Sequence, residues 1–104
     1  MKHARLRDLN VARIGLGAMG MSHGFTGAGS DDAESIRTIH RAIDLGVTLI
    51  DTAEIYGPYI NEELVGRALV GRRDEVYLAS KGGVGLVDGV KVIDGRPETL
   101  RAQV

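Results

Sequence analysis

The sequence predicts an α/β fold with a parallel sheet, because apolar stretches typical of strands alternate with patterns typical of helices. Short strand-like runs occupy residues 11–14, 47–50 and 76–80, and a helical pattern follows each of them. We expect each crossover between successive strands to be right-handed. The chain has 104 residues, of which 43% are hydrophobic and 26% are charged. That length suits one domain or part of one, and no linker divides it.

The charge balance and the cysteine content exclude several kinds of site. Lys and Arg total 13 against 14 for Asp and Glu, so the chain lacks a basic footprint for nucleic acid or an anionic membrane. With 0 cysteines, it has no disulfide, thiolate nucleophile or cysteine-based zinc site. The N-terminus lacks an apolar signal segment, and no apolar run approaches the roughly 20 residues that span a bilayer. We therefore expect a cytoplasmic protein without nucleic-acid or membrane partners.

The first segment is expected to form a short hairpin that feeds the first strand of the sheet. Residues 4–14 alternate loosely between polar and apolar side chains. The strand runs into a glycine-rich segment at residues 15–20. A loop is expected next, and it contains Gly24, Gly27 and Gly29.

The first helix has a start signal and a stop signal. Asp31 lies three residues before Glu34, which is the spacing of a capping box. Gly46 is placed to end the helix in the left-handed conformation. Apolar residues recur at helical spacing and form the expected buried face: Ala33, Ile36, Ile39 and Ile43. A short buried strand follows and ends at Asp51.

A second helix is expected after a loop at residues 52–60. Asn61 is its expected cap, and the acidic residues Glu62 and Glu63 suit the positive end of the helix dipole. Gly71 is expected to end it. The expected apolar face comprises Leu64, Val65, Ala68 and Leu69.

The remaining pattern predicts a third strand, a loop and the start of a third helix. The strand at residues 76–80 leads directly to Lys81. Residues 82–96 are rich in glycine and are expected to form a loop. Pro97 suits the first position of a helix.

Residues 15–20 also match the dinucleotide-binding pattern Gly-x-Gly-x-x-Gly. That interpretation requires a helix that begins within the motif and an acidic residue about 20 positions further on. The expected helix cap, Asp31, comes well after the motif, and Asp51 lies 31 residues beyond Gly20. A glycine-rich turn at a strand end of another α/β fold is therefore favoured over a Rossmann module.

Three polar residues at or just beyond strand ends form a candidate catalytic group: Asp51, Tyr56 and Lys81. Ligands of α/β folds bind at the carboxyl ends of parallel strands, and neighbouring strands lie about 4.8 Å apart. A phenol is a weak proton donor at neutral pH, and a neighbouring ammonium favours its ionised form. Asp51 would hold Lys81, Lys81 would tune Tyr56, and Tyr56 would protonate a carbonyl oxygen. A turn cap, a packed loop tyrosine and a solvated lysine would use the same residues, and the spacing leaves that alternative open.

Several motifs resemble those of the aldo-keto reductases. Residues 15–22 read GLGAMGMS, which is similar to the first-strand segment of that family. Its signature region is similar to DTAEIYG at residues 51–57 and NEELVG at residues 61–66. Residues 78–81, LASK, are similar to its third-strand signature. The resemblance covers nearly the whole chain and is closest to the bacterial and plant branch that reduces aldehydes and ketones.

The resemblance implies the N-terminal part of a (β/α)8 TIM barrel, with about three βα units after an N-terminal hairpin. It also implies hydride transfer from NADP(H) to a small aldehyde or ketone, without a metal. Tyr56 would donate the proton, with Asp51 and Lys81 as its supports. Asp51 would also lie near the nicotinamide ribose. The segment implied to line the nicotinamide end of the cofactor is Gly17, Ala18 and Met19.

The family's catalytic histidine has no counterpart in this chain, because that residue follows a fourth strand. The three histidines lie elsewhere in the expected fold: His3, His23 and His40. A complete barrel takes about 250 residues, so we expect residues 1–104 to be one partial barrel domain that is inactive alone. The alternative is a truncated non-catalytic protein or an interaction module that retains the first barrel strands. Neither interpretation specifies an oligomeric state.

Overall fold

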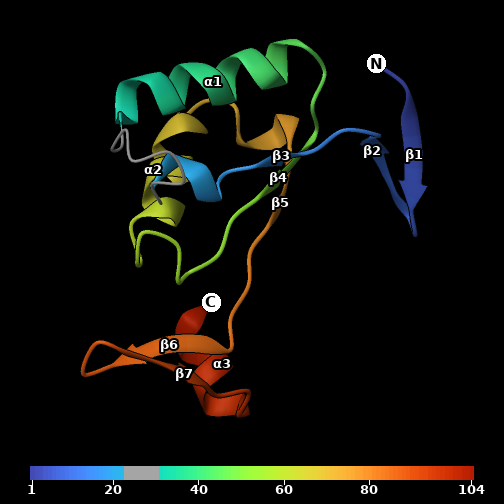
Figure 1. Ribbon diagram of the computed structural model, residues 1–104. Helices are drawn as coiled ribbons and strands as arrows, with labels where there is room; N and C mark the ends of the chain where they lie inside the picture. The colour runs from blue at the N-terminus through green and yellow to red at the C-terminus, as the bar shows by residue number, and fades with distance from the viewer. Residues whose placement is uncertain (23–30) are drawn as a thin grey trace.

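The computed structural model describes residues 1–22 and 31–104 and confirms an α/β fold. Three parallel strands form the central sheet in the order β3 (Leu16–Gly17), β4 (Leu49–Asp51) and β5 (Tyr77–Ala79) (Figure 1). Gly17 pairs with Asp51, and Asp51 pairs with Ala79. These three residues therefore lie in one row across the carboxyl edge of the sheet. The predicted loop with His23, Gly24, Gly27 and Gly29 lies outside the described residues.

Helix α1 (Asp32–Asp44) begins and ends at the predicted signals. The Asp31 carboxylate accepts a hydrogen bond from the backbone N–H of Glu34 at 3.1 Å, which confirms the cap. Gly46 has φ of +98°, the left-handed conformation expected of a residue that follows a helix. Ile39 and Ile43 are buried, but Ala33 is exposed, so its predicted place on the buried face is wrong. Ser35 is the buried residue of the first turn.

Helix α2 (Asn61–Ala68) packs against α1 through the predicted apolar face. The hydrophobic core joins both helices to the sheet, with Ile39, Ile50 and Val65 fully buried at its centre. His40 of α1 hydrogen-bonds through Nε2 to the Ala68 carbonyl at 2.7 Å, which ties the two helices together. Burial of one Ile or Val side chain of this core stabilises the fold by about 1.5–3 kcal/mol.

The predicted cap of α2 is wrong. Ile60 occupies the cap position, and it makes no side-chain cap hydrogen bond. Asn61 is instead fully buried, with its amide turned toward the segment before α1. The physical reason is that buried polar groups need hydrogen-bond partners. The Asn61 amide bonds to the Ala18 carbonyl and to the hydroxyl groups of Ser22 and Thr52.

The glycine motif at residues 15–20 does not open an α-helix. It forms β3 and a short 3₁₀ helix, η1 (Met19–Met21), and α1 begins only at Asp32. This arrangement agrees with the sequence argument against a Rossmann module. A second short 3₁₀ helix, η2 (Arg73–Glu75), precedes β5.

The predicted N-terminal hairpin is present as β1 (His3–Leu6) and β2 (Leu9–Ala12), which pair antiparallel. Figure 1 shows it to the side of the helices, beyond β3. The backbone N–H of Ala12 donates to Thr48 Oγ1 at 2.8 Å, so the hairpin is attached to the residue before β4.

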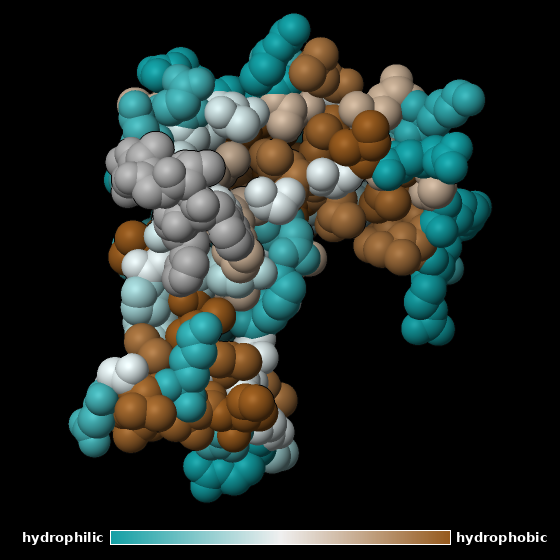
Figure 2. All heavy atoms as spheres, in the orientation of Figure 1, coloured by the Kyte–Doolittle hydropathy of each residue, from teal (hydrophilic) through white to brown (hydrophobic). Residues whose placement is uncertain are grey.

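The segment predicted as a glycine-rich loop at residues 82–96 is a second hairpin, so the loop prediction is wrong there. Strands β6 (Val84–Val87) and β7 (Val90–Ile93) pair antiparallel. Asp88 and Gly89 both have positive φ, 51° and 77°. Positive φ at both central residues gives a two-residue turn whose twist matches that of the strands it joins. The hairpin and α3 carry hydrophobic side chains on their surface (Figure 2), among them Val87, Val90 and Ile93.

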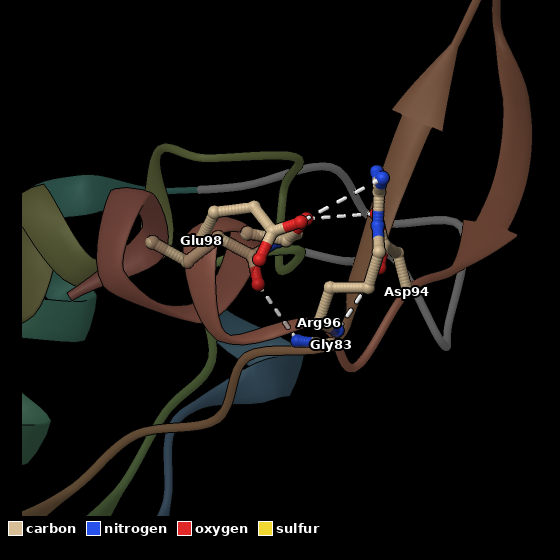
Figure 3. A network of polar contacts seen from close by, with 6 residues as sticks. Gly83, Asp94, Arg96 and Glu98 are labelled. Atoms are coloured by element: carbon tan, nitrogen blue, oxygen red, sulfur yellow. Dashed lines mark hydrogen bonds and ion pairs between the residues drawn. The ribbon is translucent and has the colours of Figure 1, made fainter.

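Helix α3 (Pro97–Gln103) begins at the predicted proline and is fixed to the base of the second hairpin. Asp94 accepts hydrogen bonds from the Arg96 guanidinium at 2.8–3.1 Å and from Thr99 Oγ1 at 2.7 Å (Figure 3). The Asp94 N–H donates to the Gly83 carbonyl at 2.9 Å, and the Gly83 N–H donates to Gln103 Oε1 at 2.7 Å. Among the described residues, no helix is long and apolar enough to cross a membrane.

Candidate active site

The carboxyl ends of β4 and β5 bring the predicted catalytic group together. Asp51 is the last residue of β4, and Lys81 lies two residues beyond the end of β5. The two strands are direct neighbours in the sheet. Tyr56 lies in the turn that follows β4, five residues after Asp51. The expectation that Asp51 and Lys81 meet across adjacent strands is therefore confirmed.

Lys81 is the hub of this group. Its ammonium forms an ion pair with the Asp51 carboxylate. It also donates to the Thr52 carbonyl at 2.8 Å and to the phenol oxygen of Tyr56 at 3.1 Å. An ammonium has three N–H groups, so every donor is used. Its Nζ also lies 4.9 Å from the centroid of the Tyr56 ring, within the range of a cation–π contact.

The surroundings keep Lys81 charged. Partial burial lowers the pKa of Lys81, but the hydrogen bonds to Asp51 and Tyr56 outweigh it and leave the pKa above its ordinary value. Lys81 is therefore a fixed cation at neutral pH and is unsuited to act as a base. The side chains of Lys81 and Asp51 are 48% and 46% exposed, so a ligand can approach the group from solution.

A buried polar network supports the turn that carries Tyr56. The Asn61 amide donates to the Ala18 carbonyl at 2.8 Å and to Ser22 Oγ at 2.7 Å. Its oxygen accepts from Thr52 Oγ1 at 2.5 Å. Asn61 thus links the segments after β3 and β4, a role that the sequence analysis missed because its partners are distant in the chain.

The predicted cofactor segment lies beside Asp51. Gly17 pairs with Asp51 across the sheet, and a Cβ atom added at Gly17 would meet no atom of residues 1–22 or 31–104 within 4 Å. Space is therefore open over this strand end. Met19 is half-buried and faces the same cavity as Tyr56. Ala18 is fully buried, and its N–H donates to the Asp51 carbonyl at 2.8 Å, so it fixes the position of its two neighbours.

Two hollows flank the catalytic group. A cavity of about 170 Å³ touches the Tyr56 ring and is lined by Met19, Ile55, Tyr56, Pro58, Leu86 and Lys91. A larger hollow of about 370 Å³ lies beyond Lys81, between α2 and α3, and Tyr56 does not line it. Of these two hollows, the smaller is the better candidate for a reacting group, because Tyr56 lines it.

Two further carboxylates, Glu54 and Glu62, belong to the segments after β4 and at the start of α2. Burial, with a smaller contribution from Glu62, raises the pKa of Glu54 above its ordinary value. Ser80 Oγ donates to Glu62 Oε1. Within residues 1–22 and 31–104, no group of three or more His, Asp or Glu side chains could hold a metal ion.

Two of the three histidines are engaged away from this group. His3 in β1 hydrogen-bonds to the Met1 carbonyl at 3.0 Å, and His40 is bonded to α2 as described above. His23 lies outside the described residues.

The sequence model of the Aldo/keto reductase family matches residues 13–104. The chain belongs to the aldo-keto reductase family. It is 44% identical over 85 residues to the aldo-keto reductase YhdN of Bacillus subtilis, with 78% of this chain and 25% of YhdN covered. This aldo-keto reductase chain thus spans about a quarter of the length of that curated relative.

Solved structures support the same conclusion and identify the fold. PA4992, an aldo-keto reductase of Pseudomonas aeruginosa, is 36% identical with a TM-score of 0.83, covering 97% of this chain and 38% of that one. AKR11C1 of Bacillus halodurans in its holo form is 30% identical with a TM-score of 0.84, covering 98% and 33%. A Klebsiella pneumoniae aldo-keto reductase in complex with NADPH is 38% identical with a TM-score of 0.60, covering 68% and 24%. The chain therefore has the fold of the N-terminal part of a (β/α)8 barrel.

Proposed function

We propose that this chain carries the proton-donor side of an NADP(H)-dependent oxidoreductase that reduces aldehydes or ketones to alcohols. The observation that carries the proposal is the contact between the Lys81 ammonium and the Tyr56 phenol, with Asp51 paired to the same ammonium. Phenol, cation and carboxylate stand at one strand edge, where ligands of this fold class bind. Family membership supports the same reaction class.

Tyr56 is the proposed general acid. A carbonyl is reduced when its carbon accepts a hydride, which a bound nicotinamide cofactor would supply, and its oxygen accepts a proton. Tyr56 gives its phenolic proton to the carbonyl oxygen and becomes a phenolate. The Lys81 ammonium, 3.1 Å away, stabilises that negative charge until solvent returns the proton. Asp51 balances the charge of Lys81 and fixes its position.

The residues present fit a nicotinamide cofactor at the sheet edge. Gly17 leaves room for a ligand at the end of β3, Met19 borders the cavity at Tyr56, and Asp51, the strand partner of Gly17, offers a half-exposed carboxylate. A carboxylate in this place suits hydrogen bonds from ribose hydroxyls. The cofactor supplies the hydride when bound, and the NADPH complex of the Klebsiella pneumoniae relative supports this choice.

We also propose that residues 1–104 are one partial barrel domain and do not turn over carbonyls in isolation. The chain covers between 24% and 38% of the length of the solved relatives. Tyr77 and Leu78 of β5 remain 40% and 38% exposed, whereas strands of parallel sheets are normally buried on both faces. Rapid NADPH oxidation by the isolated 104-residue chain would contradict this proposal.

The reaction class is tested on the native protein that contains these residues, purified from its source. NADPH oxidation is followed at the nicotinamide absorbance with a panel of simple aldehydes and ketones, and the alcohol product is identified by mass spectrometry. Stoichiometric alcohol formation is the expected result. NADPH binding without turnover of any carbonyl would instead favour the non-catalytic interaction module.

A further inference from the structure

The cavity beside Tyr56 contains a charged side chain that the proposed reaction does not use. Five of its six lining residues are apolar or aromatic, and the sixth is Lys91. Among the residues that the structure describes, the Lys91 side chain takes part in no ion pair or hydrogen bond. Lys81, in contrast, is neutralised by Asp51. Lys91 is an exposed residue, and it therefore gives the rim of this cavity a positive charge that no described carboxylate pairs with.

The register of the second hairpin directs Lys91 to the cavity. Lys91 of β7 is the direct cross-strand partner of Leu86 of β6. Opposite residues in an antiparallel pair project from the same face, and both residues line the cavity. The adjacent pair, Val87 and Val90, projects from the other face and is 59% and 65% exposed.

The hairpin is held over Tyr56 at two places. Near its tip, the N–H of Leu86 donates to the phenol oxygen of Tyr59 at 3.1 Å. At its base, Asp94 and Gly83 join it to α3, as Figure 3 shows. Lys91 thus stands on an anchored hairpin, so ligand binding has to order the lysine side chain but not the backbone that carries it.

We propose that Lys91 selects carbonyl substrates that carry a carboxylate at the end remote from the reacting carbonyl. The carbonyl oxygen lies at the Tyr56 phenol, the apolar walls of the cavity contact the middle of the substrate, and the carboxylate meets the Lys91 ammonium. The cavity of about 170 Å³ is below the usual range for drug-sized ligands, which favours a small substrate. This inference rests on the proposed reductase function.

The test compares two aldehydes of nearly equal shape, 4-carboxybenzaldehyde and its methyl ester, as substrates of the native protein. Lys91→Gln is compared with the wild type and with Lys2→Gln, which removes an exposed lysine near the N-terminus. We expect Lys91→Gln to lower the ratio of kcat/KM for the acid to that for the ester by about five- to tenfold. The loss falls on KM, because the contact is remote from the reacting atoms. Lys91→Glu lowers the ratio further, and Lys2→Gln leaves it unchanged.

The outcomes separate the two proposals. If both aldehydes are reduced and Lys91→Gln leaves the ratio unchanged, the role of Lys91 is overturned and the reductase function stands. A raised KM for NADPH with an unchanged ratio places Lys91 at the cofactor and also overturns the inference. Failure of the wild type to oxidise NADPH with these two aldehydes and with every carbonyl of the panel overturns the reductase function, and the inference falls with it.

Discussion

The Lys81 ammonium donates a hydrogen bond to the Tyr56 phenol oxygen at 3.1 Å, across 25 residues of sequence. The same ammonium pairs with Asp51 and with the Thr52 carbonyl. One side chain thus joins the ends of two parallel strands and places a cation beside the group proposed to lose a proton. The catalytic interpretation depends on this contact more than on any single residue.

Replacing Lys81 by Met is expected to impair the reaction much more than the fold. The variant removes the charge that stabilises the phenolate, so we expect kcat to fall by about 10²-fold or more. The ion pair is half-exposed, and exposed pairs contribute at most about 1 kcal/mol to the free energy of unfolding. Steady-state kinetics and urea unfolding of the native protein measure the two effects.

Lys2→Met is the matched control, since Lys2 is exposed near the N-terminus. It should leave kcat unchanged. Because the pKa of Lys81 is raised, its ammonium persists at and below its ordinary pKa and is lost only above it. The advantage of the wild type over Lys81→Met should therefore be constant from pH 6 to 9, and a loss of that advantage within this range would contradict the role assigned to Lys81.

Replacing Asn61 by Ala is expected to destabilise the protein through its buried network. Asn61 is fully buried, and its removal leaves the Thr52 hydroxyl without its partner and the Ala18 carbonyl with the Met21 N–H alone. We expect the free energy of unfolding to fall by about 2–4 kcal/mol. Asn10→Ala, at an exposed position of β2, serves as the control in the same urea titration. Equal effects of the two substitutions would show that the network contributes nothing specific.

Replacing Asp94 by Asn is expected to loosen the junction of the second hairpin with α3 in a pH-dependent way. The Arg96 guanidinium, the Arg96 N–H and Thr99 hold the pKa of Asp94 well below its usual range. A carboxyl with a lowered pKa stabilises the fold above its ordinary pKa of about 3.9, and this contribution is lost as the pH falls through the lowered value.

Hydrogen exchange at the amide of Leu100, which donates to the Arg96 carbonyl at 3.0 Å, reports on that junction. We expect faster exchange in Asp94→Asn than in the wild type at pH 6, and convergence of the two in strong acid. Asp88→Asn, in the hairpin turn, is the control. A difference that persists unchanged in strong acid would contradict the electrostatic explanation.

Elements with local signals were predictable from the sequence. The Asp31 cap needs only a residue three positions away, and Gly46 needs only its own left-handed backbone. The second hairpin also has a local signal, because Asp88 and Gly89 stand between apolar residues, the pattern of a two-residue turn. The glycine content of residues 82–96 obscured it.

Features that depend on distant partners were less predictable. Asn61 resembles a helix cap in sequence, but Ala18, 43 residues away, determines its buried role. Lys91 shows no local pattern at all, because the anchoring of Leu86 by Tyr59, 27 residues earlier, brings it to the cavity. The meeting of Asp51 with Lys81 was predictable only because parallel neighbouring strands place their carboxyl ends together.

The most direct test of the central claim compares Tyr56→Phe with Tyr77→Phe in the native protein. Both variants remove one phenol oxygen, but only Tyr56 contacts Lys81, whereas Tyr77 lies 40% exposed on β5. If Tyr56 is the proton donor, Tyr56→Phe lowers kcat for aldehyde reduction by at least about 10²-fold. NADPH affinity remains unchanged, and Tyr77→Phe keeps wild-type kcat. Equal kcat values for the two variants would contradict the assignment of Tyr56 as the general acid.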